Sequence, residues 1–205
     1  GTHTSSTGNI GYFKIISESA VAAGVRRIEA VTGAQAEELL YAAEDMILQL
    51  KSFFNNTPNL TGSIKKLITD NESLKKNVEE FMKERAIMLK ETLIKNAQQI
   101  NGYHVLVLKG AFAAEIVKNA AALAKAECNN TVLIAATEHE GKPTLTLMYT
   151  DDLVAKGANA GKDIREAAKL INGGGGGQPS LATAGAKNTE GLDAAFDKLM
   201  EIAVK

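Results

Sequence analysis

Three basic residues precede a run of glycines in the C-terminal third of the chain. Lys162, Arg165 and Lys169 are spaced at i, i+3 and i+7, so on a helix they would share one face and form a basic stripe. Glycine leaves its backbone N–H open to a close anion and can form a phosphate-binding nest. Together these features favour contact with an RNA phosphate backbone. The candidate RNA-binding residues are Lys162, Arg165, Lys169, Gly173, Gly174, Gly175, Gly176 and Gly177.

The same features also have purely structural explanations. Exposed cations are common on a solvated helix face, and a glycine run can be a flexible linker or a tight turn. Two nucleotide-binding motifs are excluded. No Gly-Lys-Ser/Thr follows the run, as it would in a Walker A loop, and no strand leads into it, as in a dinucleotide-binding fold. The sequence therefore leaves both RNA contact and a structural role open.

Residues that could support catalysis are scattered. Cys128 is the single cysteine, which rules out an internal disulfide and fits a reducing compartment. Without a His–Asp pattern near it, we interpret Cys128 as structural. Asp151 and Asp152 follow an expected strand and suit the cap of a short helix better than a metal site. We find no carboxylate pair or Ser–His–Asp set, so we expect no catalytic residues in this chain.

The composition is that of an ordinary soluble globular protein. The chain has 205 residues, of which 45% are hydrophobic and 23% charged. Its net charge of −1 neither favours nor excludes nucleic acid, since a local patch can act where net charge does not. No apolar run approaches the roughly 20 residues of a membrane helix, so we expect no membrane partner. Because the chain lacks tryptophan and has few aromatics, base stacking is a poor main binding mode.

Hydrophobic periodicity divides the chain into three parts. Residues 1–33 show two short apolar strand patterns between glycine turns, and two such strands do not make a stable sheet alone. Residues 34–101 show apolar residues at three- and four-residue steps, interrupted by Asn55–Pro58. Thr57-Pro58 fits the start of a second helix, and Gly102 fits its C-cap. These patterns predict part of a larger β-containing domain followed by two helices.

The second helix carries a heptad seam that runs from Ile64 to Met88, with Asn71 and Arg85 as its polar members. Two such helices joined by a short loop predict an antiparallel coiled-coil hairpin. An apolar seam can also pair between chains, so a homodimer through this region stays open. After Gly102, strand patterns near residues 105–108, 131–136 and 144–149 mix with helical patterns near 113–126, 161–172 and 192–204. This order predicts an α+β or α/β fold, closing with a compact globular domain over residues 102–205.

The segment from Gly1 to Gly33 resembles the end of the editing domain of alanyl-tRNA synthetases. We therefore interpret the chain as beginning in the middle of that domain. In that family, a histidine closes a Cys-Gly-Gly-Thr-His motif, and its cysteine and histidine bind zinc. The resemblance implies that His3 is a zinc ligand only together with ligands upstream of Gly1. A zinc site needs about four donors, and this chain offers no others with matching spacing.

The glycine run resembles the glycine-rich signature of the DHHA1 domain, which ends alanyl-tRNA synthetases and some DHH phosphoesterases. The family usually has six glycines, then Arg-Pro, then small residues that end in Gly-Gly. This chain has Asn172, Gln178 and Ala186 where the family has the first glycine, the arginine and the last glycine. Glutamine cannot replace the charged fork of arginine, which weakens any phosphate contact expected at that position.

The order of these parts resembles alanyl-tRNA synthetases over essentially the whole chain. The resemblance implies an editing-domain tail (1–33), a helical hairpin (34–101) and a DHHA1-like tRNA-binding domain (102–205). In that family the full enzyme joins alanine to tRNA(Ala) with ATP and magnesium, and a zinc-dependent domain edits mischarged tRNA. We therefore interpret the chain as a C-terminal, cytoplasmic fragment that binds tRNA(Ala), needs no cofactor itself and catalyses nothing alone.

Three alternatives stay open from the sequence. The first is a free-standing editing hydrolase with the same C-terminal extension. The second is the accessory domain of a DHH phosphoesterase, against which the first 33 residues argue. The third is a structural module that dimerises through the helical region without binding RNA.

Overall fold

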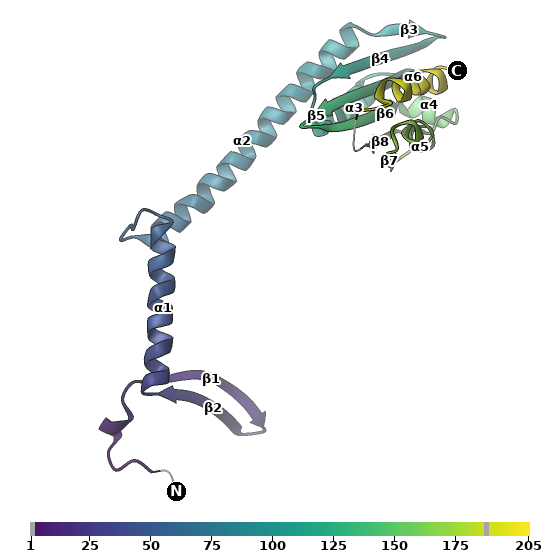
Figure 1. Cartoon of the computed structure of the whole chain (residues 1–205). Coiled ribbons are helices and arrows are strands. Elements are labelled where there is room, and N and C mark those ends of the chain that lie inside the picture. The colour runs from purple at the N-terminus through teal and green to yellow at the C-terminus, as the bar shows by residue number, and fades with distance from the viewer. Residues whose placement is uncertain (1–2, 187–188) are drawn as a thin grey trace. The chain divides into compact units, whose positions relative to one another are not determined.

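The computed structural model describes residues 3–186 and 189–205. The chain divides into two compact units, Gly1–Ser73 and Leu74–Lys205, and Figure 1 shows the elements of each. The fold is mixed α and β, as the sequence predicted, with one long helix and a sheet domain. Within the described residues, no helix is both long and apolar enough to span a membrane.

The first unit contains a β-hairpin and a helix. Strands β1 (Phe13–Ala22) and β2 (Val25–Thr32) pair antiparallel after a short 3₁₀ helix, η1 (Thr7–Ile10), and Gly24 adopts φ +77° in the tight turn between the strands. Helix α1 (Ala34–Ser52) follows directly, and Ala36 is its one buried residue. Apolar residues such as Phe13, Ile15 and Ile28 are more than half exposed. That this segment belongs to a larger β-containing domain stays a prediction.

The two helices predicted in the middle of the chain are confirmed as helices, but two of the predicted boundaries are wrong. Helix α2 (Leu60–Lys95) begins after Asn59, whose side chain accepts a hydrogen bond from Gly62 N at 3.0 Å, rather than at Thr57. It ends seven residues before Gly102, which instead lies at φ +87° in a β-turn. Residues 98–100 instead form a short strand that pairs antiparallel with residues 103–105, so the helix ends before them. Pairing of α1 with α2 as a hairpin stays a prediction.

A six-stranded sheet forms the centre of the second unit. Its order is β3-β4-β5-β6-β8-β7, and β4 with β5 is the one parallel pair among its five pairings. The strands are β3 (Gln98–Ile100), β4 (Tyr103–Gly110), β5 (Thr131–His139), β6 (Lys142–Tyr149), β7 (Gly174–Gly177) and β8 (Leu181–Gly185). The helical elements are α3 (Ala114–Glu127), α4 (Asp151–Ala155), α5 (Ala160–Ala168), η2 (Lys169–Ile171) and α6 (Leu192–Ala203).

Both faces of this sheet are covered. Side chains on both sides of β5 are therefore buried, and its sequence is a continuous apolar run from Val132 to Ala136. Alternate side chains such as Ile134 and Leu147 pack on one face with residues of α5 and α6. Leu133 and Met148 point to the other face, where they pack with α3 and with the last turns of α2. The end of the long helix is therefore part of the globular core rather than an appendage to it.

An ion pair joins α2 to α3 at the edge of this second core layer. The Lys90 ammonium lies 2.7 and 2.8 Å from the two carboxylate oxygens of Glu127. Lys90 is only 8% exposed, whereas the Glu127 side chain is about half exposed. Because a buried charge without a partner is costly, the ammonium depends on this single carboxylate.

We predict that Glu127→Ala lowers the free energy of unfolding of the full chain by about 1–2 kcal/mol, because it leaves the nearly buried Lys90 ammonium unpaired. Water reaches the site from the half-exposed glutamate side, which limits the loss. Urea denaturation followed by circular dichroism measures the change. Glu201→Ala is the matched control, because Glu201 pairs with Lys198 at 3.4 Å on the surface of α6 and should change stability by less than about 0.5 kcal/mol. Equal losses in both variants would contradict the assignment.

Candidate nucleic-acid interface

The glycine run forms a β-strand instead of the nest, linker or turn that the sequence left open. Gly174–Gly177 make up β7, which pairs antiparallel with β8 and lies at the edge of the six-stranded sheet. The chain turns back through Gln178-Pro179-Ser180, where Gln178 N donates to Leu181 O at 2.9 Å. Gln178 is exposed at this turn, so the residue that replaces the family arginine lies directly beside the strand.

Three of the glycines are required by close packing. A Cβ atom on Gly175 would overlap the backbone and side chain of Ala184, and one on Gly177 would overlap Leu181 O. Gly173 is equally tight against the carbonyl of Gly185. None of these positions has a positive φ, so the requirement is the close approach of neighbouring chain segments and not backbone conformation.

The other two glycines of the run have different surroundings. A Cβ atom on Gly174 would meet nothing within 4 Å. The three atoms nearest to a Cβ atom on Gly176 would all belong to the side chain of Arg165, with Nη2 at 3.3 Å, Nε at 3.4 Å and Cζ at 3.8 Å. The glycine run therefore contains packing positions, one position covered by Arg165 and one, Gly174, that opens to free space.

The basic stripe lies on the exposed side of α5 and η2. Asn159 caps α5 by accepting a hydrogen bond from Lys162 N at 3.0 Å. The predicted core residues Ile164, Ala168 and Ile171 are buried, whereas Lys162, Arg165 and Lys169 are exposed. The α-helix ends at Ala168 rather than at residue 172, and Lys169 begins the 3₁₀ turn, but the three cations keep their common exposure.

None of these three cations has an ion-pair partner among residues 3–186 and 189–205. In contrast, Lys90, Lys109 and Lys125 are each engaged by a carboxylate within 2.9 Å. The cations of the second unit that lack an ion-pair partner in the described chain thus include these three on α5 and η2. Because α5 packs against the edge strand β7, an anionic partner there would meet both the cations and the strand's backbone.

A partly buried hydrogen bond holds α5 against the sheet. The Tyr149 hydroxyl, at the end of β6, donates to the Asp163 carboxylate at 2.8 Å. Burial, followed by the bond to Asp163, raises the pKa of Tyr149 well above its usual value. Ala160 N also donates to Pro179 O at 2.8 Å, which ties the start of α5 to the β7–β8 turn. These contacts fix the helix that carries Lys162 and Arg165.

The remaining sequence candidates do not assemble into a site. His3 is exposed, and no group of three or more His, Cys, Asp or Glu residues in the described chain could hold a metal ion. The residues present therefore do not fit a zinc site by themselves. Asp151 and Asp152 lie in the first turn of α4, whose N-cap position is Thr150. Asp151 pairs with Lys125 at 2.9 Å, and Asp152 accepts from Asn130 N at 3.0 Å, so both have structural roles.

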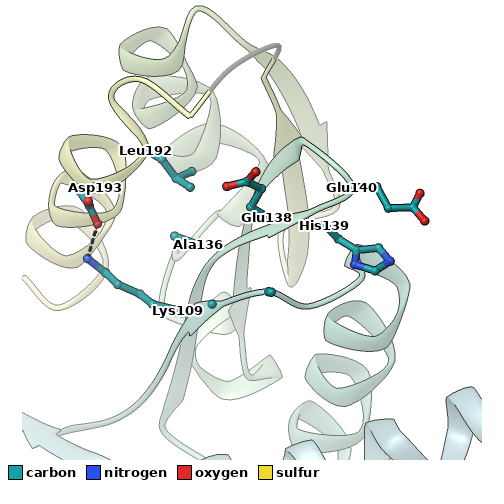
Figure 2. Close-up of a pocket in the computed structure, with 9 residues that line it drawn as sticks. Lys109, Ala136, Glu138, His139, Glu140, Leu192 and Asp193 are labelled. Atoms are coloured by element: carbon teal, nitrogen blue, oxygen red, sulfur yellow. Dashed lines mark hydrogen bonds and ion pairs between the residues drawn. The ribbon is translucent and has the colours of Figure 1, made fainter.

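Sequence reasoning missed a cavity of about 550 Å³ at the carboxyl ends of β4 and β5. Figure 2 shows Lys109 reaching across it to Asp193, at 2.8 Å, while His139 and Glu140 point away from Lys109. The Lys109 ammonium also lies 4.2 Å from the centre of the Phe196 ring. Because this cation is already engaged and Glu138 and Glu140 add negative charge, the cavity is a poor match for a phosphate.

The glycine positions offer a direct test of the close packing between β7 and β8. We predict that Gly175→Ala destabilises the chain by about 1–3 kcal/mol, because the new methyl group overlaps Ala184 and must push β7 and β8 apart. Gly174→Ala is the control on the same strand, since its methyl group enters open space. Thermal or urea denaturation compares the two. Equal stability of both variants would show that β7 and β8 do not pack this closely.

The Tyr149–Asp163 bond predicts a dependence of stability on pH. The pKa of Tyr149 is raised in the fold, so the stability that it contributes is present below its ordinary pKa of 10.0 and is lost as the pH rises above that value. Tyr149→Phe should lower the free energy of unfolding by about 1–2 kcal/mol near pH 7 and flatten its fall above pH 10. Urea denaturation at a series of pH values measures both effects. Tyr41→Phe, at an exposed position on α1, should change neither.

Comparison with known proteins places this sequence in a family. The sequence profile described as "DHHA1 domain" matches residues 101–205, and the one described as "Threonyl and Alanyl tRNA synthetase second additional domain" matches residues 1–29. Among solved structures, the C-Ala domain from Aquifex aeolicus alanyl-tRNA synthetase is similar with a TM-score of 0.47 and 23% identity, covering 53% of this chain and 98% of that one.

Curated relatives extend the similarity over almost the whole chain. An alanine–tRNA ligase of Bacteroides thetaiotaomicron is 54% identical over 204 residues, which are 99% of this chain and 23% of the relative. One of Parabacteroides distasonis is 46% identical over 202 residues, with 98% and 23% covered. The chain thus spans about a quarter of the length of these relatives. It belongs to the DHHA1 family, and the relatives that match it over nearly its whole length are alanine–tRNA ligases.

Proposed function

We propose that this chain is the tRNA-binding and positioning region of an alanine–tRNA ligase. One observation carries the proposal: three exposed cations without ion-pair partners in the described chain lie on α5 and the turn after it, and α5 packs against an edge strand made only of glycine. The similarity to alanine–tRNA ligases over 99% of the chain supplies the partner, tRNA(Ala).

The chemistry of this surface suits a phosphate backbone better than bases. Arginine and lysine attract phosphodiesters at any sequence, and a strand without side chains lets a bulky backbone approach closely. Aromatic residues, which would stack on bases, are only 5% of the chain. The surface therefore binds and orients RNA. Recognition of alanine tRNA in particular would rest on the shape of the tRNA and on other parts of the protein.

The activity of the whole protein is part of the same proposal. The full-length enzyme would join alanine to tRNA(Ala) with ATP and magnesium and would edit mischarged tRNA in a zinc-dependent domain, in the cytoplasm. His3 would contribute to that zinc site only together with ligands outside this chain. Residues 1–33, 34–101 and 102–205 would then be the editing-domain tail, the helical arm and the tRNA-binding domain.

The helical arm is proposed as a spacer. A helix of 36 residues, such as α2, is about 54 Å long at 1.5 Å per residue. Its seam leaves Leu74, Phe81 and Met88 more than half exposed, and α1 carries further exposed apolar residues. Such seams pair within one chain as a hairpin or between chains as a homodimer. Analytical ultracentrifugation across concentrations separates the two: a mass that stays monomeric supports the hairpin.

We predict that charge reversal of the basic stripe weakens tRNA binding. Replacing Lys162, Arg165 and Lys169 with glutamate should reduce the affinity of the chain for alanine tRNA at least roughly tenfold and lessen its salt dependence, because three phosphate contacts are lost. Fluorescence anisotropy at two salt concentrations measures both effects. A tRNA with a disrupted elbow should bind the unmodified chain more weakly.

The matched control reverses three exposed lysines elsewhere, Lys65, Lys66 and Lys76 on α2, and so produces the same change in net charge. Equal weakening in this control would indicate general electrostatic attraction. No binding by the unmodified chain at low salt would overturn the RNA-binding role and leave self-association as the better account.

A further inference from the structure

A second cavity, of about 240 Å³, lies beside the first turn of α5. Its lining comes from β4, the end of β6, α4 with the loop after it, α5 and the end of α6, and it includes the apolar side chains of Leu153, Ile202 and Ala203. Pockets for drug-sized ligands measure roughly 300–1,000 Å³. This smaller cavity therefore suits one flat ring system rather than a large ligand.

Two tyrosines and an aspartate supply hydrogen-bonding groups to the cavity. The Tyr149 hydroxyl donates to Oδ2 of Asp163 at 2.8 Å, and Oδ1 of Asp163 has no hydrogen-bond partner among the described residues. Tyr103 is half-buried and adds an aromatic ring, and its hydroxyl forms no hydrogen bond with any other residue that the structure describes. The cavity thus combines an aromatic surface with a carboxylate oxygen that is free to accept.

Positive charge surrounds the same cavity. The exposed Lys156 and Lys205 also line it, and neither forms an ion pair within residues 3–186 and 189–205. Asp163 directly follows Lys162, the first cation of the basic stripe, so the cavity and the stripe share the beginning of α5. An aromatic ring beside cations is the combination with which proteins bind unpaired nucleotides.

We propose that this cavity binds one unstacked base of the RNA, with the base against the Tyr103 ring and its amino group donating to Oδ1 of Asp163. This inference rests on the proposed RNA-binding function and adds base recognition to it. Lys156 and Lys205 attract the phosphates on either side of that base. The low aromatic content of the chain excludes stacking as the main binding mode, but one pocket requires only one ring.

The carboxylate oxygen decides which bases fit the cavity. An ionised carboxylate accepts hydrogen bonds and donates none. Guanine, adenine and cytosine carry an exocyclic amino group that donates, whereas the corresponding groups of uracil are carbonyl oxygens. Uracil should therefore bind more weakly, because its oxygens would face the negative charge of Asp163. Unpaired loop bases are the usual targets of specific RNA recognition, and a tRNA offers such bases.

Titration of the full chain with single nucleotides, followed by nuclear magnetic resonance, tests this preference. The 5′-monophosphates of guanosine, adenosine and cytidine should shift the ring signals of Tyr103 and bind at least roughly fivefold more tightly than that of uridine. Asp163→Asn should abolish or reverse the preference, because an amide can accept from Tyr149 and also donate to a carbonyl oxygen of uracil. Glu166→Gln is the matched control: it removes the same charge from α5 at an exposed position outside the cavity and should keep the preference.

Binding of alanine tRNA, followed by fluorescence anisotropy, tests the stacking contact. Tyr103→Ala should weaken binding roughly tenfold, because the base loses its aromatic surface. Tyr103→Phe keeps the ring and should bind within about twofold of the unmodified chain. Circular dichroism checks that both variants fold.

The outcomes separate the base pocket from the basic stripe. Equal affinity for the four nucleotides, no binding of any of them, or unchanged tRNA affinity in Tyr103→Ala would overturn the pocket, while a loss from the triple charge reversal would still uphold the stripe. Absence of tRNA binding by the unmodified chain would remove both. If Tyr103→Ala does not fold, Asp163→Asn decides, because an unchanged preference against uridine in that variant would contradict the role of the carboxylate.

Discussion

The close approach of β7 to β8 is the constraint on which the candidate interface depends. Side chains at Gly173, Gly175 and Gly177 would each overlap neighbouring atoms, so a strand of ordinary residues could not lie here. Once the strand is seated, α5 can pack beside it: Gly161 lies against the Gly177 carbonyl, and Ala160 bonds to the turn that follows. The close approach of β7, β8 and α5, which the glycines permit, therefore sets the position of the cations on α5.

Much of this fold could be predicted from the sequence because its signals are local. The apolar runs that became β5 and β6, and the periodic helices α1, α2 and α6, were evident from spacing alone. The glycine run was not, since glycine has no strand propensity and its pairing with β8 depends on tertiary contacts. The start of α2 was misplaced for a similar reason: Thr57-Pro58 and Asn59 offer competing local signals, and the structure uses the cap on Asn59.

The candidate site was partly predictable in the same sense. Helical spacing showed that Lys162, Arg165 and Lys169 would share a face, and burial of Ile164 and Ile171 agrees with it. Spacing could not show that the Arg165 fork faces one particular glycine, because that contact joins residues on different elements. Spacing also could not show that Lys109, on β4, forms an ion pair with Asp193. Such ion pairs distinguish the cations that already have a carboxylate partner from those that are free to bind a ligand.

The last turns of α2 have a consequence for how this protein can be divided. The DHHA1 profile begins at residue 101, but Ala86, Leu89 and Leu93 are buried against Leu106 and Leu133 of the sheet. Cutting the chain where the profile begins would remove the part of this layer that α2 supplies, which would leave α3 alone over that face and expose apolar side chains to water. The stretch that the family profile matches is therefore smaller than the packed core, and the last turns of α2 are as much a wall of the domain as a connection to it.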